Sequence, residues 1–575
     1  MAWRTGGCAG RCLLPLVLLA ASLLDWSLIS LVNMIFFFAI RFVAPRRGFR
    51  AWRLYLLFWC TIVYSVLASL AQVTFHLIWC IEGEGWVVAH SWWAKLVGFA
   101  RSQPGESPSV IYFLVVQLSA AVLALVEVFG SRLYQDSCCL NFSFGIEQIG
   151  YHLRVACCFL LPAVQLVVSI SHPSWISLPF FVFSCIGVVD WSLTSNFLGL
   201  FRWWRLLEIY SVFIILLLYV YQLPVKFPYV VLAFADFIGL FKISSNSEWP
   251  EVSSGISLLF YYFMLSSAKQ DIQDMDSLMS LENDSLAEEL LPSRNVFLVR
   301  QSRSGRRHAN VLLRGSVFRT FSINFFTYGF PVLLLALSLW SFNFTSICAF
   351  GLLAYVGYIL YAFPSLFEMH RLNGSLLVFI LLWAASTYIF NVAFTFFNKR
   401  FQKDMMIWET IGLWHYSIPG LFLLAQFCLG VFVALCNLVN NSVFVYTTTE
   451  GGASSSDDHL IDEKEDTMVL IVATLAWGLR KLSRAITLML LFLLVVKPGF
   501  IHAVYMCFFL VFLLNHSIKK GLRQILVLFC EAHFSILYIL QLDLVSSALE
   551  RSGSLTMEVL SQLGWSEQVS SAVSV

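Results

Sequence analysis

Residues 110–129 read VIYFLVVQLSAAVLALVEVF, an apolar stretch in which Glu127 is the charged side chain. A helix that crosses a bilayer needs about 20 such residues, and it satisfies its own backbone polar groups where no water is present. Roughly fifteen runs of this character, each long enough to cross or enter a bilayer, fill the chain. The sequence therefore predicts an all-α, polytopic membrane protein.

The composition supports this fold class. The chain has 575 residues, of which 59% are hydrophobic and 12% charged, whereas soluble proteins carry about 25% charged residues. The net charge is +2, so there is no overall attraction to nucleic acid, and no nucleic-acid partner is expected. The 14 cysteines lie mostly inside apolar runs and lack the paired spacing of a zinc site.

The spacing of the runs indicates a repeated unit. Long charged interruptions follow about every fourth run, near residues 130–150, 269–320 and 438–481. We predict an array of four-helix transmembrane units. Residues 1–150 form the first unit with an N-terminal hairpin, and 151–320 form the second unit with a charged cytosolic segment. Residues 321–467 form the third unit with an acidic Ser/Gly-rich linker beginning at Thr447, and 468–575 form an interfacial helix and an incomplete fourth unit with a divergent C-terminal end.

The first apolar run has two interpretations. Arg4 and Arg11 precede Leu13–Leu24, which is the arrangement of a signal peptide. However, apolar sequence resumes at Trp26. We predict two short membrane helices that meet near Asp25, and a cleaved signal peptide is the alternative.

Other segments are typical of the membrane–water interface. Gly85–Phe99 contains three tryptophans, and such rings favour the headgroup layer. These candidate anchors are Trp86, Trp92 and Trp93. Val230–Phe241 is short for a crossing, and Met468–Leu479 runs directly into basic residues. Both are also predicted to lie flat in the interface.

Basic residues predict the orientation. They crowd the connections after the second, sixth and fourteenth runs, which places the three long interruptions in the cytosol. Lys399, Arg400 and Lys403 form a loop that disagrees with this orientation.

An arginine-rich segment follows the second group of runs. An arginine beside the membrane surface attracts anionic lipid by about 1 kcal/mol. The candidate lipid contacts are Arg300, Arg303, Arg306, Arg307, Arg314 and Arg319. A simple topology signal is the alternative interpretation.

The sequence contains no motif typical of catalysis. It has no GxxxxGK[ST] loop, no HExxH and no GxSxG, and its histidines are scattered singly. We therefore expect no enzyme, no cofactor and no metal site. The acidic residues within the apolar runs lie near run ends, which favours structural caps over a proton relay. They are Glu127, Asp190, Glu208 and Asp236.

Long stretches of the chain resemble a known family. Leu13–Pro45, with its break at Asp25-Trp26, is similar to the start of Piezo-type mechanosensitive channels. The plant branch of that family is resembled by Val311–Pro331 (VLLRGSVFRTFSINFFTYGFP), Ala349–Phe367 (AFGLLAYVGYILYAFPSLF), Ile411–Gly420 (IGLWHYSIPG), Asn437–Phe444 (NLVNNSVF) and Ile471–Ala485 (IVATLAWGLRKLSRA). The resemblance extends from about residue 12 to residue 564, and Trp565–Val575 is expected to diverge.

The resemblance implies an architecture and a function. Piezo proteins are homotrimers whose curved blades are arrays of four-helix units, and membrane tension on the blades opens a central cation pore. This implies a tension-sensing blade that lacks the C-terminal pore, so no pore residue is assigned. The expected partners are the lipid bilayer and anionic lipids, in the plasma membrane or a vacuolar or other endomembrane. A polytopic small-molecule transporter is the alternative function.

Overall fold

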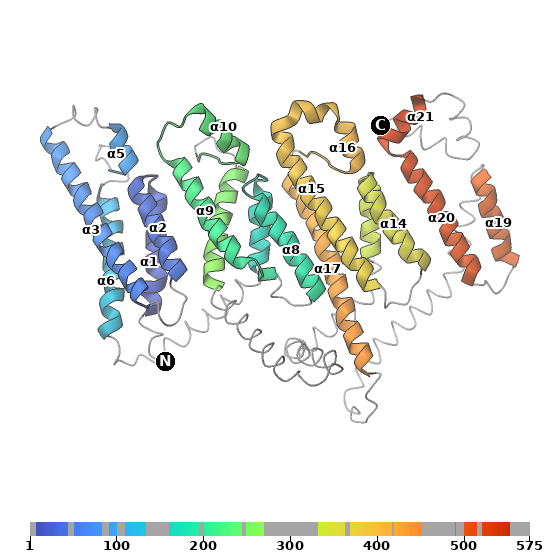
Figure 1. Ribbon diagram of the computed structural model, residues 1–575, viewed down its shortest axis with the longest axis horizontal. Coiled ribbons are helices and arrows are strands. Elements are labelled where there is room, and N and C mark those ends of the chain that lie inside the picture. The colour runs from blue at the N-terminus through green and yellow to red at the C-terminus, as the bar shows by residue number, and fades with distance from the viewer. Residues whose placement is uncertain are drawn as a thin grey trace, which may run out of the picture. The chain divides into compact units, whose positions relative to one another are not determined.

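The structure is a computed structural model that describes residues 7–43, 51–82, 91–99, 110–133, 160–194, 200–243, 249–268, 332–362, 369–416, 419–450, 489, 500–514 and 520–551. These residues form helices and the turns between them, with no strand among them, which confirms the all-α fold class (Figure 1). Contacts divide the chain into two compact units: Met1–Trp191 with Asn196–Asn295, and Ser192–Ser195 with Val296–Val575. The four predicted domains and their boundaries stay predictions.

The first unit begins with a helical group made of α1 (Gly7–Leu24), α2 (Leu28–Val43), α3 (Ala51–Glu82) and α6 (Val110–Leu133). The short helix α5 (Ser91–Val97) lies between α3 and α6 in the chain. Helix α1 packs against α2 and α6, and α3 packs along α6. The prediction of two helices that meet near Asp25 is confirmed, because α1 ends at Leu24 and α2 begins at Leu28.

A second helical group completes this unit. It contains a helix at 160–171, α8 (Leu178–Thr194), α9 (Trp204–Gln222), the short α10 (Tyr229–Ile238) and a helix at 249–268. Buried residues of both groups form one hydrophobic cluster, in which Phe37 of α2 is found together with Leu207 of α9. Both groups therefore share the order of hairpin, third helix, short helix and fourth helix.

The second unit repeats this order. Its third helical group has a helix at 332–343, α14 (Ile347–Ala362), α15 (Met369–Lys403), the short α16 (Met405–Ile411) and α17 (Pro419–Glu450). Helix α15 packs along α17. The unit also contains α19 (Phe500–Leu514), α20 (Lys520–Leu540) and α21 (Asp543–Arg551), which we call the fourth group. Helix α14 of the third group contacts α20.

Two local predictions in this unit are wrong. The residues 399–403, predicted as a loop, lie in the last turns of α15, beyond a break in the helical geometry at Phe397 (φ −105°, ψ 25°). Helix α17 continues to Glu450, past Thr447, where the linker was predicted to begin. In both places the charged or polar residues extend an apolar helix, because helical backbone hydrogen bonds do not require apolar side chains.

The distribution of side chains is that of a membrane protein. In α3, Leu67 is 59% exposed whereas Ser65 and Gln72 are fully buried. In lipid, apolar groups gain little from burial, and polar groups are directed inward to find partners. Five helices are long and apolar enough to cross a membrane: Trp52–Ile78, Ile111–Phe129, Trp204–Gln222, Gly374–Phe397 and Pro419–Leu438. Shorter apolar helices accompany them, including both helices of the N-terminal hairpin.

Candidate functional site

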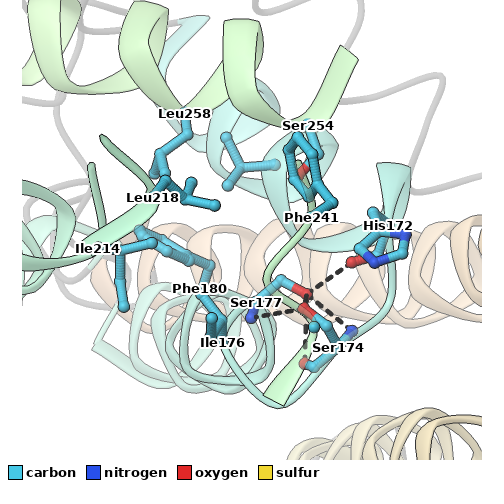
Figure 2. A pocket seen from close by; sticks show the side chains of 12 residues that line it. His172, Ser174, Ile176, Ser177, Phe180, Ile214, Leu218, Phe241, Ser254 and Leu258 are labelled. Atoms are coloured by element: carbon cyan, nitrogen blue, oxygen red, sulfur yellow. Dashed lines mark hydrogen bonds between the residues drawn. The ribbon is translucent and has the colours of Figure 1, made fainter. Parts of the chain in front are cut away.

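Serine side chains close the turn between the first two helices of the second group (Figure 2). The backbone N–H of Ser174 donates to Ser177 Oγ at 3.0 Å, and the N–H of Ser177 donates to Ser174 Oγ at 3.3 Å. The Ser177 hydroxyl also donates to the carbonyl oxygen of His172 at 2.8 Å. This reciprocal arrangement resembles a capping box, which satisfies the first N–H groups of a helix. The turn is therefore held by its own side chains.

The short helix α10 ends against this turn. Gly239 follows α10 with φ 90°, and its N–H donates to Ala235 O at 3.0 Å in a left-handed helix end. A Cβ at this position would collide with Ser174 Cβ. The N–H of Ile176 donates to Ile238 O at 3.3 Å. Glycine thus permits both the backbone conformation and the close approach.

The first group has the same arrangement, in which the end of a short helix lies against the hairpin turn; we call it a turn assembly. Ser27 directly precedes α2, and its Oγ accepts the N–H of Ser30 at 3.3 Å. Gly98 follows α5 with φ 102°, and a Cβ there would collide with the Ser27 hydroxyl. Phe99 then stacks on Phe75 of α3, with ring centroids 4.6 Å apart.

The third group has it as well. The Oγ of Ser346 accepts the N–H of Ala349 at 3.1 Å. Gly412 follows α16 with φ 114°, and a Cβ there would lie 2.9 Å from Ser346 Oγ. In the described part of the chain, the glycines with positive φ are Gly98, Gly239 and Gly412. All of them lie against the hairpin serine of their own group, so we name this arrangement the glycine–serine contact.

Amide side chains on the third helix fix the segment that follows the short helix. In the second group, Gln222 donates to Phe241 O at 2.8 Å and accepts the N–H of Ile243 at 2.8 Å. In the third group, Asn391 donates to Trp414 O at 3.0 Å. The indole N–H of Trp383 donates to Gly412 O at 2.8 Å. In the second and third groups the segment after the short helix is therefore tied to the third helix by side chain–backbone hydrogen bonds.

The cavity beside the second turn is too small for an organic ligand. Its volume is about 20 Å³, and it is lined by groups that include Ser174, Phe180 and Phe241 (Figure 2). Small-molecule pockets have volumes of about 300–1,000 Å³, whereas a cavity of this size holds about one water molecule. This cavity therefore offers no site for a small organic ligand.

Part of the predicted interfacial and lipid-binding residues can be placed. Trp92 and Trp93 lie in α5, where Trp92 is 58% exposed and Trp93 packs edge-on against Phe75 at 6.0 Å. Trp86, the segment Met468–Leu479 and the six arginines from Arg300 to Arg319 lie outside the described residues. Helix α10 matches the predicted segment Val230–Phe241. The membrane depth of all these segments stays a prediction.

The acidic residues lie near helix ends, as predicted. Asp190 Oδ2 is 3.3 Å from the guanidinium Nη1 of Arg202, in the connection that follows α8. Glu127 and Glu208 are 8% and 2% exposed. Asp236 lies in the last turn of α10, which is a short helix and not a long apolar span. In the described residues no group of three His, Cys, Asp or Glu side chains could hold a metal ion.

Sequence reasoning missed the glycine–serine contacts and the short helices α16 and α21. A signal for the contacts does exist, since a glycine follows each of α5, α10 and α16, and a serine precedes α2, α8 and α14. The pairing of each glycine with its serine is not local: Ser27 and Gly98 are separated by the three helices α2, α3 and α5. The apolar periodicity used to find spans carries no information on such pairs.

The repeated helical groups, the outward apolar faces and the polar turn assemblies define the class: a polytopic α-helical membrane protein. Residues 471–573 match the model of the Piezo-type mechanosensitive ion channel homolog domain. The chain is also 52% identical, over 556 residues, to a Piezo-type mechanosensitive ion channel homolog of Arabidopsis thaliana. The chain belongs to the Piezo-type family.

The extent of these matches is unequal. The alignment with the Arabidopsis relative covers 96% of this chain but 22% of the relative. The family-model match ends at residue 573 and so includes Trp565, from which the sequence had been expected to diverge. The divergence of Trp565–Val575 stays a prediction, because the bounds of a match do not show how similar its last residues are.

Proposed function

We propose that this chain is a tension-sensing blade segment of a mechanosensitive cation channel, and that ions pass through a pore that this segment does not itself form. The observation that carries the proposal is the 52% identity to a Piezo-type channel homolog across 96% of this chain. That alignment covers 22% of the relative, which is a much longer protein. The blade role is therefore proposed for the segment that aligns, and channel activity is not assigned to it.

The physical basis of sensing is work done by the membrane on a change of area. A conformational state that occupies more area in the bilayer plane is favoured by tension, as any ligand favours the state to which it binds more tightly. Transmission of that displacement requires units that tilt without deforming. The glycine–serine contacts and the buried amide hydrogen bonds support this requirement, because they fix the ends of helices within each group.

The proposed partners follow from the same reasoning. The bilayer contacts the apolar outer faces, of which Leu67 and Val122 are 59% and 56% exposed. Anionic lipids would contact the arginine-rich segment, and homotrimer formation would involve the longer chain. The membrane would be the plasma membrane or a vacuolar or other endomembrane.

Electrical recording tests whether the segment conducts. The purified chain is reconstituted into liposomes, and membrane patches are stretched by suction. We expect no stretch-activated current. Reproducible currents that depend on tension and on the presence of the chain would overturn the assignment of the pore to another part of the channel.

A distance measurement tests tension sensing itself. Fluorophores are introduced through noncanonical amino acids at Lys95 and Asp404, which are exposed residues of the two units, and the chain is placed in giant vesicles held by micropipette aspiration. We expect the energy transfer between the fluorophores to change reversibly with tension. Energy transfer that stays constant up to membrane rupture would contradict the proposed role.

The transporter alternative is not favoured by any described feature. A transporter would hold its substrate near the bilayer midplane between broken helices, and the cavity of about 20 Å³ in the second group is far smaller than a substrate site. Substrate-dependent flux in proteoliposomes would revive this alternative.

A further inference from the structure

Two tyrosines connect neighbouring helical groups in the same way. In the first unit, the hydroxyl of Tyr219, on α9 of the second group, lies 3.0 Å from the carbonyl oxygens of Ser22 and Asp25, in the hairpin of the first group. In the second unit, the hydroxyl of Tyr538, on α20, lies 3.0 Å from the carbonyl oxygen of Ser341, in the hairpin of the third group. Each tyrosine follows its serine by 197 residues.

The hairpin supplies groups that need such a partner. Ser22 is in the last turn of α1, where backbone carbonyls have no partner within the helix. In the second unit the turn also presents an N–H, since that of Ser346 donates to the Tyr538 hydroxyl at 3.1 Å. A tyrosine hydroxyl donates one hydrogen bond and accepts others, so it serves both kinds of group at once.

Aromatic contacts fix each ring in place. Tyr219 packs on Trp26 with ring centroids 5.1 Å apart, and Tyr538 packs on Phe350 at 5.6 Å. Both tyrosines are 2% exposed. A buried hydroxyl without partners would be costly, so the ring position and the hydrogen bonds support each other.

The contact extends along the helices below each tyrosine. In the first unit, Arg41 of α2 donates to Ser267 Oγ at 3.1 Å, and Phe38 meets Tyr262 edge-on at 4.8 Å. In the second unit, the carboxylate of Glu531 on α20 lies against Gly357 of α14, where an added Cβ would be 2.6 Å from Oε2. The tyrosine is therefore one end of an interface between two groups and does not act as an isolated contact.

The tyrosine has a recognisable sequence context. Residues 219–223 read YVYQL, 538–542 read YILQL and 388–392, in α15, read YIFNV. In α3, residues 69–73 read SLAQV, with serine at the tyrosine position. The amide residue that ties the turn assembly and the tyrosine that reaches the neighbouring group are thus separate features of the third helix.

We propose that Tyr219 and Tyr538 are inter-group joints, each of which locks a helical group to the hairpin turn of the group before it, so that each pair of groups moves in the bilayer as one element. The lock itself rests on the contacts within each unit. Its use in transmitting tension rests on the proposed function. In each joint a single tyrosine hydroxyl, in an apolar environment, hydrogen-bonds backbone groups of a turn that would otherwise lack partners.

Hydrogen exchange tests each joint separately. Tyr219→Phe and Tyr538→Phe are prepared in the full chain, in nanodiscs and without applied tension, together with the controls Tyr112→Phe and Tyr358→Phe. The control tyrosines are 59% and 52% exposed. Removal of one net hydrogen bond should raise the exchange of amides in the adjoining turn about fivefold. We expect this rise at residues 22–31 for Tyr219→Phe and at 341–350 for Tyr538→Phe, with no change for the controls. Unchanged exchange at either turn would overturn that joint.

A distance distribution tests whether the hydroxyl couples the groups. Spin labels are introduced through noncanonical amino acids at Lys95 of α5 and Tyr229 of α10, which are exposed residues of the first and second groups. We expect a narrow distribution in the wild type and a broader one in Tyr219→Phe. Equal widths would contradict the lock. Because neither measurement applies tension, a chain that failed to respond to tension would refute the proposed function and leave the joint intact.

Discussion

Gly239 lies so close to Ser174 that the glycine has no room for a side chain. The same relationship joins Gly98 to Ser27 and Gly412 to Ser346. Each of these glycines has a positive φ, a conformation that costs an L-residue about 1–2 kcal/mol. In every described group with a short helix before its fourth helix, the end of that short helix is therefore fixed on the hairpin turn by a position that only glycine suits.

Replacement of Gly239 by alanine should destabilise the first unit by at least about 1–2 kcal/mol, since the left-handed backbone strain and the collision with Ser174 act together. The matched control is Gly255→Ala in the same group. A Cβ at Gly255 would lie 3.6 Å from Phe241 Cζ, an ordinary contact, and alanine favours the helix by up to about 1 kcal/mol. The thermal unfolding midpoint should fall for Gly239→Ala only. Equal midpoints would contradict the glycine–serine contact.

Trp383→Phe should destabilise the third group by about 1–3 kcal/mol, because the carbonyl of Gly412 would lose its buried donor. Trp408→Phe is the control, since its indole N–H has no hydrogen-bond partner among the described residues while its ring packs on Phe390 at 5.6 Å. Both changes reduce ring size, so the difference between their midpoints in a thermal scan reports the hydrogen bond. No difference would show that the bond to Gly412 contributes nothing.

The turn that contains His415 should become less stable in acid. Partial burial against Phe394, with ring centroids 4.0 Å apart, lowers the pKa of His415 below its usual value of about 6.5. A lowered pKa in the folded state means that the stabilisation is fully present above pH about 6.5 and is lost as the pH falls through the folded pKa. Amide exchange at residues 412–416, corrected for the intrinsic effect of pH, should rise more between pH 8 and 5 in the wild type than in His415→Gln. An identical rise in both would refute the assignment.

The arginine-rich segment should bind anionic membranes. A peptide of residues 294–319 is compared with a variant that carries Arg300→Gln, Arg303→Gln, Arg306→Gln and Arg307→Gln. Each arginine contributes about 1 kcal/mol near an anionic surface, so the variant should bind vesicles containing phosphatidylserine far more weakly. A peptide with Ser302→Ala and Ser304→Ala should bind as the wild type does. If the arginine variant binds equally well, the topology-signal interpretation remains.

The sequence by itself determined the fold class and the family. Apolar runs of bilayer length predict helices regardless of the rest of the chain, because a backbone in lipid must satisfy its own hydrogen bonds. The sequence also predicted the break at Asp25, the short helix α10 and the position of acidic residues such as Asp190 near helix ends. Each of these features is marked by residues that are adjacent in the chain.

The tertiary structure decided what lies between those helices. Packing that the local sequence does not encode decides whether residues 399–403 form a loop or the end of α15. It also decides where the short helix α16 ends and which serine each glycine meets. The hydroxyl of Tyr538 meets Ser341 across 197 residues of chain, and no periodicity in either segment predicts that meeting. The length of an apolar run specifies that a helix enters the membrane. Which helices lie together is specified by a few polar groups that find their hydrogen-bond partners only on another helix.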